Sequence, residues 1–299
     1  MPKTRKRKVP ITGVSSTSNA TSSKPKSSRA VIRGFHVLLK QQAQLQKVIV
    51  DDISKKTELA DIEREIEELG GLESYQRMSA IGQGTDRGGG SEKILIRWLK
   101  DKELHKPEKK LRLLEVGALK PDNYADCSSW IKATPIDLNS QHPSIMEQDF
   151  LLLDHKQNRE NWDIISLSLV LNFVPEPLNR GEFSSLSFLA VIVISCSYDT
   201  GRMLRLSYDF LVGGGHLFVA LPLSCLSNSR YLNFDFFSDL MEILGFSERQ
   251  RHWRKGGKMV YYLFQKRVDA RMESITVPDR FSKKTILRQG NRNNFSIIL

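Results

Sequence analysis

Two positions at the ends of short apolar runs have the residue types and spacing of a nucleoside-binding site. The run at residues 111–116 is followed by Gly117, and Asp137 comes 20 residues later, near the end of a second run. In doubly wound sheets, ligands bind outside the carboxyl ends of the parallel strands. A glycine there lets the backbone approach the ligand closely, and an acidic residue can accept hydrogen bonds from ribose hydroxyls. Gly117 and Asp137 are therefore predicted to bind one nucleoside.

The glycine content of the first turn indicates which nucleoside fits. A dinucleotide site has the pattern G-x-G-x-x-G, which cradles a pyrophosphate. This turn has Gly117 alone, and an adenosyl ligand without a pyrophosphate needs fewer glycines. The sequence therefore favours S-adenosyl-L-methionine (SAM) over a nicotinamide dinucleotide.

Further polar residues could complete such a site. Asp149 lies 12 residues after the first carboxylate, and its side chain could accept the adenine amino group while Phe150 packs on the base. Ser168 and Asn172 belong to the apolar stretch 162–174, which would bring them to the same edge. Structural alternatives stay open: the glycine could simply end a strand, both carboxylates could cap helices, and Asn172 could satisfy a strand end.

The elements that would position these residues alternate between strand and helix patterns. Apolar runs predict strands at residues 111–116, 133–138, 150–153, 162–174, 216–223 and 259–265. Apolar residues at helical spacing predict helices at residues 202–211 and 234–244 and within residues 31–108, where Ser91 is expected to cap the last helix. Alternating strands and helices predict an α/β fold with a largely parallel sheet.

The net charge of +11 over 299 residues is concentrated at the two ends of the chain. Residues 1–30 hold eight basic residues and no acidic one, and residues 266–299 hold eight basic and three acidic ones. Residues 1–30 also have few large apolar side chains, so this tail is predicted to be disordered. A near-neutral body with basic ends indicates contact with a polyanion such as nucleic acid. A nuclear-import signal with a solvated tail is a compatible alternative.

Several classes of protein are excluded by composition. No apolar run approaches the ~18 residues of a membrane-spanning helix, and the basic N-terminus lacks the apolar core of a secretory signal. The three cysteines are isolated and the six histidines share no spacing, so neither a disulfide scaffold nor a metal site is expected.

Several strings of residues carry a resemblance to a known family over about residues 30–299. They are Gly70-Gly71-Leu72-Glu73-Ser74-Tyr75-Gln76-Arg77-Met78-Ser79, Gln83, Leu114-Glu115-Val116-Gly117, Ile136-Asp137-Leu138-Asn139, Gln148-Asp149-Phe150, Ser168-Leu169-Val170-Leu171-Asn172-Phe173-Val174-Pro175, residues 221–231 and Asn293-Asn294-Phe295. The chain resembles the fungal large-subunit (25S) rRNA adenine-N1 methyltransferases, whose animal relative is a SAM sensor in nutrient signalling.

The resemblance implies a class I, Rossmann-like SAM-dependent methyltransferase with an N-terminal helical segment. It implies that Gly117 and Asp137 contact SAM and that Asp149, Phe150 and Ser168 complete the pocket. It further implies large-subunit rRNA within the pre-ribosome as the partner, a location in the nucleus and nucleolus, and a monomer that needs no metal and no membrane.

The chemistry of adenine N1 methylation agrees with the absence of an obvious catalytic His or Cys. Adenine N1 carries an in-plane lone pair, so its attack on a sulfonium methyl needs no prior deprotonation, and positioning can supply much of the barrier. A base taken out of its stack needs an edge acceptor and an aromatic face, for which Asn172 and Phe173 are the candidate catalytic residues. They occupy the place of the Asn-Pro-Pro-Tyr string of many amino-methylating enzymes. A non-catalytic SAM sensor that binds a protein partner is the main alternative, and a small-molecule or protein methyltransferase is a weaker one.

The predicted domains are a disordered basic tail (1–30), a helical region (31–108), a methyltransferase domain (109–267) and a basic C-terminal extension (268–299) with an extra strand at 295–299. Residues 182–201 interrupt the methyltransferase domain and include the apolar run FLAVIVIS. Deleting them joins Gly181 to Arg202 and restores the spacing of the family. We interpret the segment as a retained intron, with a lineage-specific loop as the alternative; an exposed apolar run of this kind is prone to aggregate.

Overall fold

The computed structural model describes residues 53–70, 90–106, 108–140, 142–173, 197–268 and 277–299, together with residues 38, 41 and 42. The predictions for the tail 1–30, for residues 71–83, for Val174-Pro175 and for residues 182–196 lie outside these residues.

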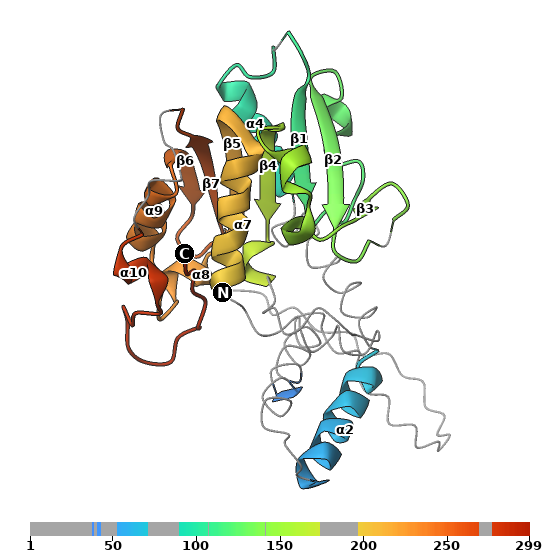
Figure 1. Cartoon of the computed structure of the whole chain (residues 1–299), viewed down its shortest axis with the longest axis vertical. Helices are drawn as coiled ribbons and strands as arrows, with labels where there is room; N and C mark the ends of the chain where they lie inside the picture. The colour runs from blue at the N-terminus through green and yellow to red at the C-terminus, as the bar shows by residue number, and fades with distance from the viewer. Residues whose placement is uncertain are drawn as a thin grey trace, which may run out of the picture.

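The described residues form one seven-stranded sheet with the order β3-β2-β1-β4-β5-β7-β6 (Figure 1). The strands are β1 (Leu111–Val116), β2 (Ile131–Asp137), β3 (Met146–Glu147), β4 (Trp162–Ser168), β5 (Leu211–Pro222), β6 (Phe246–Trp253) and β7 (Met259–Lys266). All neighbours pair in parallel except β7, which is antiparallel to both β5 and β6. The predicted α/β fold with a largely parallel sheet is confirmed.

The described helices lie before, between and after the strands in the chain. They are α2 (Ile53–Glu68), α4 (Ser91–Asp101), α5 (His155–Asn158), α7 (Ser197–Phe210), α8 (Ser224–Ser227), α9 (Phe234–Ile243) and α10 (Asp279–Ser282), with short 3-10 turns η2 (Ala125–Cys127), η3 (Phe150–Leu152) and η4 (Leu171–Phe173).

The central strands are apolar because both of their faces are covered. Successive side chains of a strand point to opposite faces. In β1, Leu114 packs in the core that also contains Met203 and Leu204 of α7. Its neighbour Leu113 packs in a second core with Trp98 of α4. Helices α7 and α4 therefore cover opposite faces of the sheet, and α7 crosses the near face in Figure 1.

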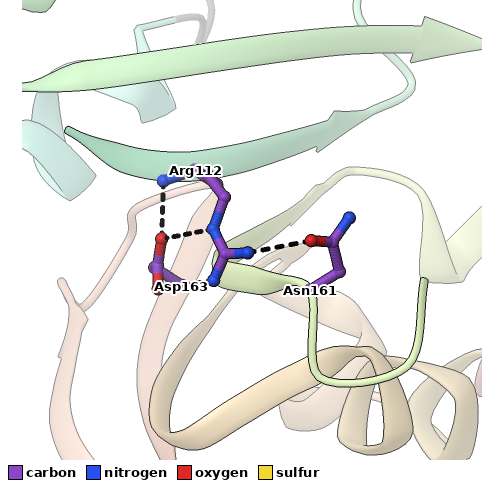
Figure 2. A network of polar contacts seen from close by, with 3 residues as sticks. All are labelled: Arg112, Asn161 and Asp163. Atoms are coloured by element: carbon purple, nitrogen blue, oxygen red, sulfur yellow. Dashed lines mark hydrogen bonds and ion pairs between the residues drawn. The ribbon is translucent and has the colours of Figure 1, made fainter. Parts of the chain in front are cut away.

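A polar network joins β1 to β4 at the amino-terminal ends of these strands (Figure 2). Oδ2 of Asp163 accepts hydrogen bonds from the backbone N–H and the Nε of Arg112, at 2.8 and 3.0 Å. Nη1 of Arg112 donates to Oδ1 of Asn161 at 2.8 Å. Since these contacts fix how β1 lies beside β4, they support the pairing of the strand ends at the opposite edge.

The structure corrects several predicted boundaries. The predicted strand at 150–153 is the 3-10 turn η3, and the third strand is the two-residue β3. Strand β4 ends at Ser168 because Leu169 has a φ of +60° and turns the chain into η4. Strand β5 begins at Leu211, so the three glycines at 213–215 lie within it. The sequence did not predict β6, whose exposed positions are Glu248, Arg249, Arg251 and Trp253.

The C-terminal segment packs on the domain without forming the predicted strand at 295–299. Its pairing is a single bridge between Asn293 and Ser229. Phe295 and Ile297 are buried in the core that α7 covers, and Asn293 donates a side-chain hydrogen bond to the carbonyl of Ser224. This segment is held by apolar burial and backbone contacts with the chain that follows β5.

Candidate functional site

The order of the strands places a topological switch point at the carboxyl ends of β1 and β4. From β1 the chain moves outward to β2 and β3 on one side, then continues with β4 and β5 on the other side. Open α/β sheets bind ligands at such a switch point. The carboxyl ends of the strands are therefore where the predicted site residues must meet.

Gly117 directly follows β1 and has a φ of +74°, a conformation that glycine adopts without strain. Its N–H and that of Ala118 donate to the carbonyl of Ile136 in β2, at 2.9 and 3.1 Å. A Cβ at Gly117 would lie 2.8 Å from Cγ2 of Val170, which follows β4. The glycine is thus required by its backbone angle and by a close contact across the switch point.

Asp137 ends β2, one residue after the carbonyl that holds the Gly117 turn. Its Oδ1 accepts a hydrogen bond from the N–H of Asn139 at 2.9 Å. Burial raises the pKa of this carboxyl, the hydrogen bond from Asn139 lowers it, and nearby Glu147 raises it. Within the described part of the chain no other group hydrogen-bonds to the carboxylate. The second oxygen can therefore accept from a ligand hydroxyl.

Asp149 and Phe150 follow β3 and differ in how they could serve a ligand. Oδ1 of Asp149 accepts a hydrogen bond from the N–H of Leu151 at 2.8 Å and so caps η3. This is the capping role that the sequence left open as an alternative to ligand binding. The ring of Phe150 is only 3% exposed and meets Phe210 edge to face at 5.7 Å. This ring fills the core and presents no open face to a base in the structure.

Ser168 ends β4 and lies beside a helix that begins 77 residues earlier. Its hydroxyl is 2.7 Å from the hydroxyl of Ser91, the first residue of α4. Ser91 was predicted to cap this helix, but the N-cap position belongs to Gly90, which has a φ of +93°. The N-terminus of α4 is therefore tied to the carboxyl end of β4.

Asn172 lies in η4, just after the end of β4. Its Oδ1 is buried and has no hydrogen-bond partner in the part of the chain that the structure describes. An unsatisfied buried acceptor costs about 1–3 kcal/mol, which makes this oxygen a candidate to accept a hydrogen bond from a ligand. The backbone of Phe173 follows in the same turn, and its side chain lies outside the described part of the structure.

Glu115 is a buried carboxyl at this edge that the sequence did not mark as functional. Nδ2 of Asn123 donates to its Oε1 at 2.7 Å. Burial raises its pKa to about 7, the hydrogen bond from Asn123 lowers it, and Glu92 in the first turn of α4 raises it. In the sequence, Glu115 was an acidic residue inside an apolar strand and part of the string Leu114-Glu115-Val116-Gly117, but no role was assigned to it.

These positions meet at one edge of the sheet. The ends of β1, β2, β3 and β4 carry Gly117, Asp137, Asp149, Ser168 and Asn172. The N–H of Gln148, which directly follows β3, donates to the carbonyl of Asp137 at 2.8 Å and so joins the ends of β2 and β3. The edge offers a glycine turn, a partly unsatisfied carboxylate and an orphaned amide oxygen, which fit the backbone, ribose and base contacts of a nucleoside. No group of metal-binding side chains occurs among the described residues.

The model of one protein family matches residues 60–297 of the chain, and its description is 25S rRNA (adenine(2142)-N(1))-methyltransferase, Bmt2. The chain belongs to this family. The resemblance drawn from the sequence is thereby confirmed, and so is the class I SAM-dependent methyltransferase fold, whose strand order the sheet has.

Individual relatives agree with the family model. The 25S rRNA adenine-N(1) methyltransferase of Schizosaccharomyces pombe is 30% identical over 97% of this chain and 98% of the relative. The 25S rRNA (adenine(2142)-N(1))-methyltransferase of Saccharomyces cerevisiae is 31% identical over 89% of this chain and 70% of the relative. Among solved structures, a Burkholderia thailandensis 1,6-didemethyltoxoflavin-N1-methyltransferase with bound S-adenosylhomocysteine is 10% identical, with a TM-score of 0.38 over 61% of this chain and 89% of that chain.

None of the described helices is long and apolar enough to span a membrane.

Proposed function

We propose that this protein transfers the methyl group of SAM to N1 of an adenosine in 25S rRNA. The family supports the reaction, and the observation in the structure that carries it is the orphaned, buried Oδ1 of Asn172, two residues after the Val170 that contacts Gly117. A base with an amino group next to its reactive nitrogen is the partner that this atom fits.

The Gly117 turn, Asp137 and Ser168 would hold the cofactor. When bound, SAM supplies an electrophilic methyl group on a sulfonium. Asp137 accepts hydrogen bonds from the ribose hydroxyls, and the backbone of Gly117 allows close approach at the end of β1. Asp149 shapes the turn that lies at the adenine end of the cofactor, since one of its carboxylate oxygens already caps η3.

Asn172 orients the target base. Its Oδ1 accepts a hydrogen bond from the N6 amino group of adenine, which turns the adjacent N1 lone pair toward the methyl group. The sequence assigns the aromatic face to Phe173, the next residue of the same turn. Because N1 carries no proton, the residues need only align base and cofactor, and such alignment can contribute about 7–11 kcal/mol to lowering a barrier.

This function carries expectations about where and with what the protein works. The substrate is large-subunit rRNA in the pre-ribosome, the compartment is the nucleolus, and the protein acts as a monomer. The basic tail at residues 1–30 supports import into the nucleus and contact with RNA.

The test is complementation of a Saccharomyces cerevisiae strain that lacks its relative. N1 methylation blocks Watson–Crick pairing, so primer extension on 25S rRNA stops at the modified adenosine. The wild-type protein should restore the stop that the deletion removes, and Asp137→Ala should fail while Glu147→Ala, an exposed acidic neighbour, should succeed. A protein that binds SAM by calorimetry but never restores the stop would instead be a sensor.

A further inference from the structure

The turn that joins β6 to β7 carries a cluster of positive charge on an exposed hairpin. Residues 249–258 contain five basic residues and no acidic one. Two of the five have partners: Arg251 pairs with Glu248 at 3.4 Å, and Arg249 donates to Oε1 of Gln265 at 2.8 Å. Arg254, Lys255 and Lys258 are exposed and form no ion pair within the described part of the chain.

An exposed aromatic residue directly precedes these cations in the chain. Trp253, the last residue of β6, is 44% exposed. One of its faces stacks on Phe234 at the start of α9, with ring centroids 5.3 Å apart and planes inclined by 30°. The packing on Phe234 holds the indole in place and still leaves a large part of its apolar surface in water.

This hairpin lies at the same edge of the sheet as the methyl-transfer site. Strand β7 is antiparallel to β5, and Met259 pairs with Pro222 at the carboxyl end of β5. The carbonyl of Lys258 accepts a hydrogen bond from the N–H of Leu223 at 2.7 Å. In the sheet order, β6 is three strands from β4, which corresponds to about 14 Å. A few nucleotides of a single strand can span that distance.

We propose that Trp253 together with Arg254, Lys255 and Lys258 forms a platform that binds single-stranded RNA next to the target adenosine. The inference rests on the proposed function, since the RNA must reach from the switch point at β4 to this hairpin. A base stacks on the open face of Trp253, and the three cations contact the phosphates of the same strand. Stacking on an aromatic ring combined with a cationic groove is how proteins bind unpaired nucleic acid.

The test measures RNA binding by the full-length protein. The probe is a fluorescein-labelled oligoadenylate of about 12 nucleotides, within the range of single-strand site sizes, and the readout is anisotropy over a series of salt concentrations. Trp253→Ala should weaken binding roughly tenfold, the cost of one lost stacking contact, whereas Trp253→Phe should keep most of the affinity.

The charge test uses two triple variants. R254A/K255A/K258A should reduce the slope of log K against log salt by about 2, because each phosphate contact on a single strand contributes about 0.7. K109A/K110A/K156A removes three exposed lysines near the amino-terminal ends of the strands and should leave the slope unchanged. Both triple variants should keep the SAM affinity and the melting temperature of the wild type, and Trp253→Ala should keep the SAM affinity, which separates RNA binding from folding.

Four outcomes of these experiments test the platform and the proposed function separately. Unchanged RNA affinity in Trp253→Ala and in the hairpin triple variant overturns the platform, and an equal loss in both triple variants overturns it as a general charge effect. If only methylation of assembled pre-ribosomal particles falls, the hairpin contacts a protein and the RNA assignment is wrong. If the hairpin binds RNA as expected but the wild type methylates no rRNA, the platform stands and the proposed function fails.

Discussion

The hydroxyl of Ser91, at the start of α4, lies 2.7 Å from the hydroxyl of Ser168, at the carboxyl end of β4. One of the two must donate to the other, which leaves one hydroxyl proton for a further acceptor. The contact makes the start of α4 part of the wall beside the cofactor edge.

This pair can be tested by a double-mutant cycle. Ser91→Ala and Ser168→Ala should each lower SAM affinity, and the double variant should lose less than the sum, with a coupling of about 1 kcal/mol. The measurement is isothermal calorimetry with SAM on all four proteins. Strictly additive losses would show that the two hydroxyls act independently.

The contact between Gly117 and Val170 predicts a second cycle. Gly117→Ala should lower the free energy of unfolding by about 1–3 kcal/mol, because alanine is strained at a φ of +74° and its Cβ would lie 2.8 Å from Cγ2 of Val170. Adding Val170→Ala should recover the steric part and leave the backbone part. Urea unfolding of the four proteins checks this, and a double variant no more stable than the sum of the single changes would contradict it.

The raised pKa of Glu115 predicts a pH-dependent stability with a definite sign. Its pKa is about 7 in the folded protein and near its ordinary value of 4.5 in the unfolded chain. The folded state therefore binds the proton of Glu115 more tightly than the unfolded chain does. The contribution of this proton to the free energy of unfolding is fully present below about pH 4.5 and is lost as the pH rises through 7. The loss is on the order of 3 kcal/mol.

Glu115→Gln keeps the acceptor for Asn123 and cannot ionise. Relative to the wild type, this variant should gain unfolding free energy between pH 5 and pH 8, whereas Glu147→Gln, at an exposed carboxylate, should follow the wild type. The measurement is the free energy of unfolding in urea as a function of pH. If the difference between Glu115→Gln and the wild type does not change with pH, Glu115 does not have the raised pKa.

The interpretation of residues 182–201 as a retained intron gains a structural test. The segment ends in Asp199, Thr200 and Gly201, which belong to α7. A Cβ at Gly201 would lie 1.8 Å from the carbonyl oxygen of Ile298, so only glycine fits there. Deleting residues 182–201 would place Gly181 at this point, directly before Arg202.

We therefore expect the deletion variant to fold with a melting temperature no lower than that of the full chain. The position that requires glycine should also move: Gly201→Ala should destabilise the full chain, and Gly181→Ala should destabilise only the deletion variant. The demanding position is Thr200, which is fully buried and whose place Arg180 would take in the deletion variant. Failure of the deletion variant to fold would contradict the interpretation. Sequencing of the transcript decides the origin of the segment.

The sequence predicted the central strands because their burial leaves a direct pattern. Strands β1, β4 and β5 are covered on both faces and read as continuous apolar runs. The edge strand β6 packs few of its side chains and carries polar residues at exposed positions, so no apolar run marks it. For the same reason, the sequence pattern did not mark Trp253 or the basic turn that follows it as functional.

The candidate site was only partly predictable for a related reason. Gly117 and Asp137 could be proposed because each follows or ends a short apolar run, whereas Ser168 lay inside the longer predicted strand 162–174 and was proposed as a pocket residue from the resemblance. The contact of Ser168 with Ser91 joins residues 77 positions apart and depends on how α4 packs on the sheet. The burial of the Phe150 ring against Phe210 likewise follows from the position of α7, whose path no local pattern shows.

The central claim is tested most directly by the reaction of the purified protein with unmodified 25S rRNA and SAM carrying a labelled methyl group, followed by digestion to nucleosides and mass spectrometry. We predict labelled 1-methyladenosine with the wild type and a rate at least tenfold lower with Asn172→Ala, while Asn172→Ala still binds SAM like the wild type. Labelled N6-methyladenosine, or no labelled nucleoside from a protein that binds SAM, would contradict the account.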